Sequence, residues 1–174
     1  MADVPDYLVL KRHRDLEGRA WQIWVRRGLI GLVCVVPVLA LFNVFGQRPA
    51  TTAVSGDAAK LELYAPARVR SGLLYEARFT IRARSELKDA TLVLAPGWAE
   101  GASINTIEPS PADEGSRDGS LLFKLGHVPS GGHFTLFMQF QVNPTNVGRH
   151  DQDVSLYDGS ERIASIRRTM TVFP

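Results

Sequence analysis

The chain has 174 residues, a formal net charge of +2 and a single cysteine, Cys34. One cysteine forms no intramolecular disulfide, which excludes a disulfide-stapled fold. The region after position 46 has 14 basic and 14 acidic residues, and a neutral region has no electrostatic footprint for nucleic acid. No glycosylation sequon is present, because Asn143-Pro144-Thr145 carries the excluding proline. Both absences fit a bacterial cell envelope better than a eukaryotic secretory route.

Residues 1–27 are expected to form a basic cytoplasmic tail that leads into a juxtamembrane helix. Trp21 and Trp24 stand one turn ahead of an apolar run, where amphipathic rings prefer the membrane interface. Arg26 and Arg27 would then lie among lipid headgroups. They are either a plain topology anchor or part of a cluster that recognises anionic lipid. The six basic residues of this segment are Lys11, Arg12, Arg14, Arg19, Arg26 and Arg27.

Residues 28–46 form a run of 19 residues without a charged side chain. As a helix this run would be roughly 28 Å long, close to the ~30 Å hydrocarbon core of a bilayer, so it predicts one transmembrane helix. Pro37 lies in its middle and predicts a kink. Asn43 is the one strongly polar residue, and its amide either reaches headgroup water or bonds a partner helix.

Three alternatives to a retained anchor are open: a buried core helix, a cleaved signal peptide, and a twin-arginine export signal led by Arg26-Arg27. The apolar run is longer than the 7–15 residues of a signal-peptide core, which favours the anchor. The basic residues lie on the N-terminal side of the run. The positive-inside rule therefore places the N-terminus in the cytoplasm and the C-terminal part outside the plasma membrane.

Residues 47–59, small and polar, are predicted to be a linker, and residues 60–174 an extracytoplasmic β-domain. Residues 74–84 alternate apolar and polar side chains, as expected for a half-buried strand. Residues 133–142 do the same, with Phe137 as an outward aromatic. Residues 161–173 are a third candidate strand. In it Ile163 and Ile166 are three positions apart, so in a regular strand their side chains would point to opposite faces. A bulge between them would mend the register.

Shorter strand candidates lie at 61–64, 91–94, 104–107, 121–125 and 154–157. Turn signals rich in Gly, Pro, Asn and Asp separate them, and Asp158-Gly159 between two strand patterns predicts a hairpin. Seven to eight short strands without a helical period predict an immunoglobulin-like antiparallel sandwich. The predicted fold class is thus one N-terminal transmembrane helix plus an all-β domain.

The order of these features resembles bacterial immunoglobulin-like surface domains of the CARDB type. The resemblance rests on LELYAPARVRSGLLYEARFTIRARSELKDATLVL, then LLFKLGHVPSGGHFTLFMQFQV, then VSLYDG. It covers most of residues 60–173. It implies a seven-stranded sandwich used in adhesion or assembly, and it implies no catalytic residue.

Candidate sites for chemistry are few. Asp151, Asp153 and Asp158, within the Arg149–Asp158 loop, are weak candidates for a cation site, because loop carboxylates are the ligands that calcium prefers. They lack the spacing of an EF-hand. No nucleophile elbow, phosphate loop or dinucleotide fingerprint occurs. We therefore expect no enzyme activity and no cofactor.

Two aromatic residues are candidates for an interaction surface. Trp98 follows Pro96-Gly97 at the end of a strand, where it either packs under a loop or lies exposed at a binding edge. Phe137 carries the same ambiguity. The first functional hypothesis is a membrane-anchored interaction module, an accessory subunit or scaffold for another envelope protein. The alternative is a tethered sensor that binds a small ligand or cation at the Arg149–Asp158 loop. An envelope enzyme is the third.

Overall fold

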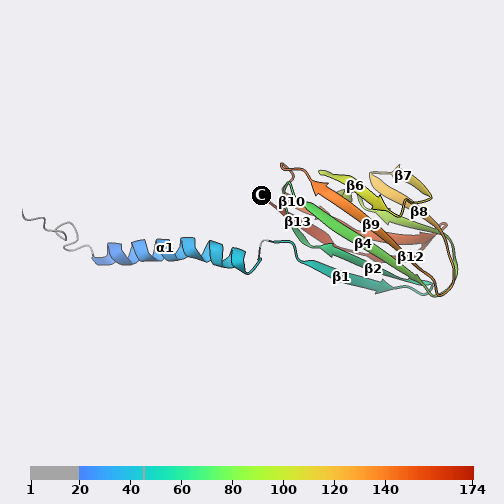
Figure 1. The fold of residues 1–174 in the computed structure, drawn as a ribbon, viewed down its shortest axis with the longest axis horizontal. Helices are drawn as coiled ribbons and strands as arrows, with labels where there is room; N and C mark the ends of the chain where they lie inside the picture. Colours follow the sequence, from blue (N-terminus) through green and yellow to red (C-terminus); the bar gives the residue numbers. More distant parts are fainter. Residues whose placement is uncertain (1–19, 45) are drawn as a thin grey trace, which may run out of the picture. The chain divides into compact units, whose positions relative to one another are not determined.

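The computed structural model describes residues 20–44 and 46–174. The chain divides into two compact units, with the boundary in the sequence between residues 44 and 45. The first contains the helix α1, and the second is an all-β domain (Figure 1). The predicted fold class, one apolar N-terminal helix followed by a mostly antiparallel β-sandwich, is confirmed.

The helix α1 spans Ala20–Leu41 and continues through Pro37. Its segment Trp21–Leu41 is long and apolar enough to serve as a membrane anchor or a signal sequence. The helix ends at Leu41, before the expected limit of the apolar run at residue 46, because Asn43 adopts a left-handed φ of 54°. The Val44 N–H donates to the Leu39 carbonyl at 3.1 Å and the Asn43 N–H to the Ala40 carbonyl at 2.9 Å. This pattern is a Schellman cap, in which asparagine is one of the few residues tolerated.

The β-domain has thirteen strands rather than seven or eight, because several are short or lack alternation. The strands are β1 (Pro49–Ser55), β2 (Ala59–Pro66), β3 (Arg68–Arg70), β4 (Leu74–Ala83), β5 (Leu87–Leu94), β6 (Ala102–Glu108), β7 (Asp113–Arg117), β8 (Ser120–Val128), β9 (His133–Val142), β10 (Gly148–Asp151), β11 (Val154–Asp158), β12 (Glu161–Ile166) and β13 (Thr169–Phe173).

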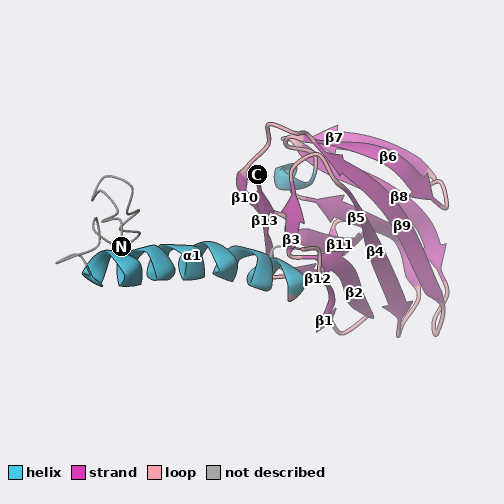
Figure 2. Ribbon diagram, turned by 60° about the vertical axis from the view of Figure 1, so that its left-hand side comes forward, coloured by secondary structure: helices cyan, strands magenta, loops and turns pink. Residues whose placement is uncertain are grey.

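Two five-stranded sheets form the sandwich, with strand orders β1-β2-β4-β9-β6 and β12-β11-β5-β8-β7. A third, smaller sheet of the same domain has three strands in the order β10-β13-β3 (Figure 2). Every pairing is antiparallel except that of β13 with β3. A single turn of 3-10 helix, η3 (Pro96–Trp98), follows β5.

The core lies between the inner faces of the sheets, as the alternation in the sequence predicts. Tyr75, Ala77, Phe79, Ile81 and Ala83 of β4 are buried, and the residues between them are exposed or half-buried. In β9 the inward positions from Leu136 to Val142 are buried and Phe137 faces outward. Burying each large apolar side chain contributes about 1.5–3 kcal/mol relative to leaving it exposed.

Two predicted segments differ from the structure. The expected linker at residues 47–59 contains β1, which pairs with β2 from Pro49↔Pro66 to Ser55↔Lys60. The expected strand at 161–173 is two strands in different sheets, β12 and β13. A bulge was expected between Ile163 and Ile166. The structure has one at Ile163 itself, since Leu156 pairs with Ala164 while Tyr157 pairs with Arg162.

Candidate functional site

The outward face of the β1-β2-β4-β9-β6 sheet carries an arginine between two aromatic rings. Tyr64 on β2 pairs with Arg78 on β4, and Arg78 pairs with Phe137 on β9, so the three side chains lie in one row across the strands. The Arg78 guanidinium carbon lies 5.4 Å from the Tyr64 ring centroid and 4.9 Å from that of Phe137. Tyr64 is 37% exposed and Phe137 40% exposed. We call these three residues the aromatic row.

Charged and polar groups flank the aromatic row on both sides. The Phe137 side chain lines two surface hollows. The first is lined by Arg78, Thr80, Arg82, Gly131, Gly132, His133, Thr135 and Phe137. The second is lined by Glu76, Thr106, Glu108, Phe137, Met138 and Gln139. One hollow therefore offers arginines and a histidine, and the other offers two carboxylates.

Local contacts hold this face in place. The Thr80 and Thr135 hydroxyls lie 3.4 Å apart across β4 and β9. Arg78 also pairs with Glu76 at 3.3 Å. Glu62 binds the Lys60 ammonium at 2.6 Å, and this bond, opposed by burial, holds the pKa of the Glu62 carboxyl below its ordinary value. Each exposed cation–π contact is worth about 0.5–1 kcal/mol, so Arg78 is fixed between its two rings more than a free surface arginine would be.

Trp98, the second candidate for an interaction surface, is fully buried. Its ring centroid lies 5.4 Å from that of Phe79 and 5.3 Å from that of Phe140, and its indole N–H donates to the Asp153 carbonyl at 3.2 Å. The Arg168 guanidinium lies over it at 5.5 Å. A buried indole with its donor satisfied is a packing residue. The interpretation of Trp98 as an exposed contact is therefore wrong.

The three loop carboxylates do not converge on one point. Asp151 accepts a hydrogen bond from the Thr169 hydroxyl at 3.2 Å, and Asp153 accepts one from the Arg168 backbone N–H at 3.0 Å. Asp158 accepts one from the Asp89 N–H at 2.7 Å. Within residues 20–44 and 46–174, no three His, Cys, Asp or Glu side chains are grouped to hold a metal ion. These carboxylates fasten strand ends instead of forming the cation site considered from the sequence.

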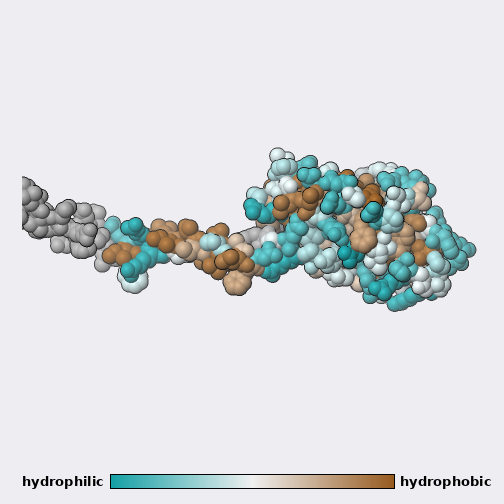
Figure 3. All heavy atoms as spheres, in the orientation of Figure 1, coloured by the Kyte–Doolittle hydropathy of each residue, from teal (hydrophilic) through white to brown (hydrophobic). Residues whose placement is uncertain are grey.

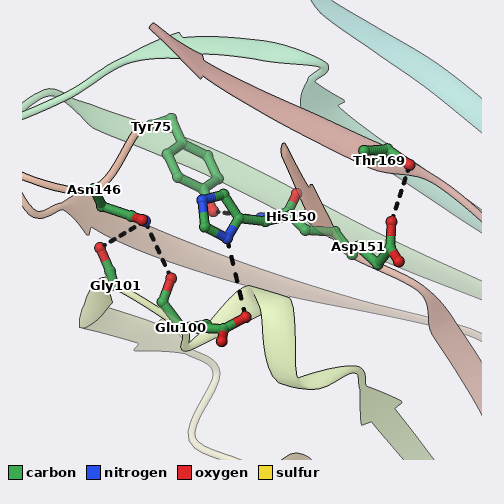
Figure 4. A network of polar contacts seen from close by, with 8 residues as sticks. Tyr75, Glu100, Gly101, Asn146, His150, Asp151 and Thr169 are labelled. Atoms are coloured by element: carbon green, nitrogen blue, oxygen red, sulfur yellow. Dashed lines mark hydrogen bonds and ion pairs between the residues drawn. The ribbon is translucent and has the colours of Figure 1, made fainter. Parts of the chain in front are cut away.

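A polar cluster lies beneath the start of the same loop (Figure 4). The Gln152 amide N–H donates to the Tyr75 hydroxyl at 3.0 Å inside the domain. Burial raises the pKa of Tyr75 to about 12, although the bond from Gln152 partly opposes this. His150 Nδ1 lies 4.0 Å from the Glu100 carboxylate, and Asn146 donates to the Glu100 and Gly101 carbonyls at 3.1 Å. The cluster joins β4, β10 and the segment after η3.

The positive charge of Arg168 acts on the Tyr75 hydroxyl of this cluster, where it lowers the pKa that burial raises. Arg168 stacks on Trp98, donates to the Pro66 carbonyl, and burial lowers the pKa of its guanidinium. The contacts of its guanidinium are thus the face of the Trp98 ring and the Pro66 carbonyl. The sequence offered no sign of this contact, because Pro66, Trp98 and Arg168 are far apart along the chain.

The candidate anchor residues lie on α1, except Asn43, which follows its end. Trp21 is 62% and Trp24 70% exposed, and the Arg27 guanidinium carbon lies 5.3 Å from the Trp24 ring centroid. Arg26 and Arg27 lie along one side of the helix with Gln22, Ile23 and Ile30. Asn43 caps the helix end, as described above. In Figure 3 the apolar colouring dominates the middle of α1, whereas the visible face of the β-domain is mostly polar with scattered apolar side chains.

Comparison with known proteins gives structural neighbours alone. No family model matches the chain, and no curated protein matches it. Among solved structures, the chitin-binding domain of a chitinase from Pyrococcus furiosus is 17% identical with a TM-score of 0.40, over 64% of this chain and 98% of that one. The GAE domain of GGA2p from Saccharomyces cerevisiae is 17% identical with a TM-score of 0.37, over 70% and 96%.

A CARDB domain from Pyrococcus furiosus, solved in complex with di-metal ions, is 12% identical with a TM-score of 0.40, over 70% of this chain and 94% of that one. The CARDB type that the sequence resembles is thus among the similar structures.

Proposed function

We propose that this protein is a membrane-anchored, non-catalytic interaction module of the cell envelope, an accessory subunit or scaffold for another envelope protein. The observation that carries the proposal is the aromatic row, Tyr64, Arg78 and Phe137. Two exposed rings hold one arginine between them on the open face of a sheet. Tyrosine, phenylalanine and arginine are enriched at the centres of protein interfaces, where they contribute most of the binding free energy.

The surroundings of the aromatic row favour binding of one specific partner over nonspecific binding. Arg78 is held by the two rings, so less conformational entropy is lost when a partner binds. The basic hollow beside Arg82 and the acidic hollow beside Glu108 lie on either side of Phe137. A partner must match both signs of charge, and mismatched charges at an interface disfavour wrong partners.

The helix α1 supplies the tether in this proposal, with the N-terminus in the cytoplasm and the β-domain outside. Trp21, Trp24 and Arg27 would lie at the headgroup level, since arginine side chains near a helix end reach back to the interface. The segment Trp21–Leu41 would be about 31 Å long, but its uncharged part from Gly28 to Leu41 only about 21 Å. The ~30 Å hydrocarbon core would therefore also include the turn that carries Arg26 and Arg27, whose long side chains reach the headgroups. Confinement at the membrane raises the effective concentration of the domain toward a membrane-bound partner.

Site-specific photocrosslinking tests the contact surface. A benzophenone amino acid at position 137 should crosslink one partner protein in intact cells. The same group at position 117 should not, because Arg117 lies on β7 in the opposite sheet with its side chain 84% exposed. Phe137→Ala should weaken co-purification of that partner by at least roughly tenfold, while Arg117→Ala should leave it unchanged. Crosslinks from both positions alike would refute the assigned surface.

Protease accessibility tests the proposed topology. A protease added outside intact cells should remove the β-domain and leave residues 1–27 protected. Cleavage within residues 1–27 under the same conditions would contradict the orientation. Loss of α1 from the mature protein would show a signal sequence in place of an anchor.

A further inference from the structure

The strand β1 is an open edge of the five-stranded sheet. It pairs with β2 alone among the described strands, over seven residues without a break in register. Pro49 to Ala53 are exposed, and no residue from 49 to 55 is charged. Such an edge presents unpaired backbone groups, and proteins commonly protect edges of this kind with charges, bulges or prolines.

The ladder shows which backbone groups of β1 are unpaired. The Gly56 N–H donates to the Ala59 carbonyl at 2.9 Å, so the even-numbered residues of β1 bond with β2. The same alternation holds across the sheet, since Ala83 bonds Gly132 on the far side of β4. The N–H and C=O groups of Thr51, Ala53 and Ser55 therefore point away from the sheet. Pro49 shares this parity, so its missing N–H falls on the open side, where it costs no ladder bond.

The other three edges of the two large sheets are protected. β6 has a register shift between Ile104 and Thr106. β7 reads DEGSR, so three of its five residues are charged. β12 has the bulge at Ile163 and begins with Glu161 and Arg162. β1 has neither a bulge nor a charge, so it alone of the four keeps a flat edge that can accept another strand.

The inner face of β1 is also incompletely covered. Ala50 and Thr52 pair with Ala65 and Leu63, which are core residues, so their side chains point toward the core side of the sheet. Both are nonetheless exposed, and only Val54 near the hairpin is half-buried. β12 approaches β1 at the hairpin end, where the Ile163 carbonyl lies against Gly56. The first half of β1 thus extends past the opposite sheet.

We propose that β1 is the site at which a second copy of this chain adds in antiparallel orientation, with Thr52 opposite Thr52. In this register Thr51 lies opposite Ala53 of the second copy, and the two residues exchange N–H···O=C bonds. Pro49 lies opposite Ser55, and the Ser55 N–H donates to the Pro49 carbonyl. Every bonding pair falls on the odd-numbered residues whose groups point outward, and both core faces stay on the same side of the joined sheet.

The composition of β1 favours a second copy over a different strand. The pairing is isologous, as expected for a two-fold dimer. It places no like charges opposite each other, and a cross-strand Thr–Thr pair is favourable. Pro49 begins eight residues after Leu41, so about 28 Å of extended chain separates β1 from α1 at most. Two copies anchored in one membrane therefore meet at a high effective concentration.

Cysteine crosslinking of the intact protein tests the register. In a Cys34→Ala background, Thr52→Cys should form a disulfide between copies, because directly opposed residues at a non-hydrogen-bonded position bring their Cα atoms to about 4.5 Å, within disulfide range. Ala53→Cys is the matched control, since Ala53 lies opposite Thr51 and not opposite itself. The purified protein in mild detergent should have twice its mass of 19.2 kDa by light scattering.

A proline variant separates pairing through β1 from pairing through α1. Ala53→Pro removes an N–H that points to the open side and leaves the β1–β2 bonds intact, so the domain should keep its melting midpoint. The dissociation constant of the dimer should rise roughly tenfold or more, because each copy loses one inter-strand hydrogen bond. Ala53→Val keeps the N–H and should keep the dimer. A monomeric wild type, equal crosslinking at positions 52 and 53, or an Ala53→Pro dimer of unchanged affinity would overturn the proposal.

Discussion

The substitution Tyr75→Phe should change how the stability of the β-domain depends on alkaline pH. Tyr75 is 3% exposed, and burial raises the pKa of its phenol from 10.0 to about 12. The unfolded chain therefore loses this proton at a lower pH than the folded domain does. The resulting stability is present in full below pH 10 and is lost as the pH rises toward 12.

The expected size follows from the same two pKa values. At pH 11 the wild type should have lost about 1.4 kcal/mol through this one group, and above pH 12 about 2.7 kcal/mol. Tyr75→Phe cannot lose this contribution. At neutral pH the variant should instead be less stable by about 1–3 kcal/mol, because the Gln152 N–H loses its acceptor inside the domain. The stacking of ring 75 on Phe140, at 5.1 Å, is retained.

Urea denaturation of fragment 45–174 between pH 8 and pH 11 measures this difference. Trp98 is the one tryptophan in the fragment, so its fluorescence reports unfolding of the core. The free-energy difference between wild type and Tyr75→Phe should shrink by about 1.4 kcal/mol from pH 8 to pH 11. Tyr64→Phe removes a phenol oxygen from an exposed ring and serves as the control. Parallel curves for wild type and Tyr75→Phe over this range would refute the reasoning.

Three further predictions concern the core, the helix end and the loop. Phe79→Ala should destabilise the domain by about 3–5 kcal/mol, whereas Gln139→Ala on the outward face should cost less than about 0.5 kcal/mol; equal losses in urea denaturation would contradict the register. Asn43→Ala should speed hydrogen exchange in the last turn of α1, and Asn43→Gly should not, since glycine accepts a positive φ. Asp153→Ala should lower the melting midpoint, while calcium should leave that of the wild type unchanged, because the loop carboxylates do not converge.

The local sequence pattern was sufficient to predict the strands that have one solvent-exposed face and one buried face. Period-two alternation in β4 and β9 identified both strands and their buried sides, because side-chain direction in a strand follows from chirality and pleat alone. The out-of-step pair Ile163 and Ile166 predicted a bulge, and the structure has one. The uncharged run after Arg27 predicted an apolar helix for the same local reason.

Features that depend on strands meeting were decided by the tertiary structure. β1 has no buried face over most of its length, so its sequence carries no alternation and resembles a linker. Trp98 became a core residue because η3 folds it against Phe79 and Phe140, which belong to strands distant in sequence. The carboxylates that were weak candidates for a cation site each accept a hydrogen bond from a different partner, the Thr169 hydroxyl for Asp151 and backbone N–H groups for Asp153 and Asp158.

The aromatic row shows the same limit most clearly. Phe137 was a candidate from its own strand, as an aromatic ring on the polar side, whereas Tyr64 and Arg78 gave no such signal. The three become neighbours because β2 pairs with β4 and β4 with β9 in one register, and that register is set by burial of the opposite faces. A strand's own sequence determines which side of it faces water, and only the packing of the whole sandwich determines which residues of other strands share that side.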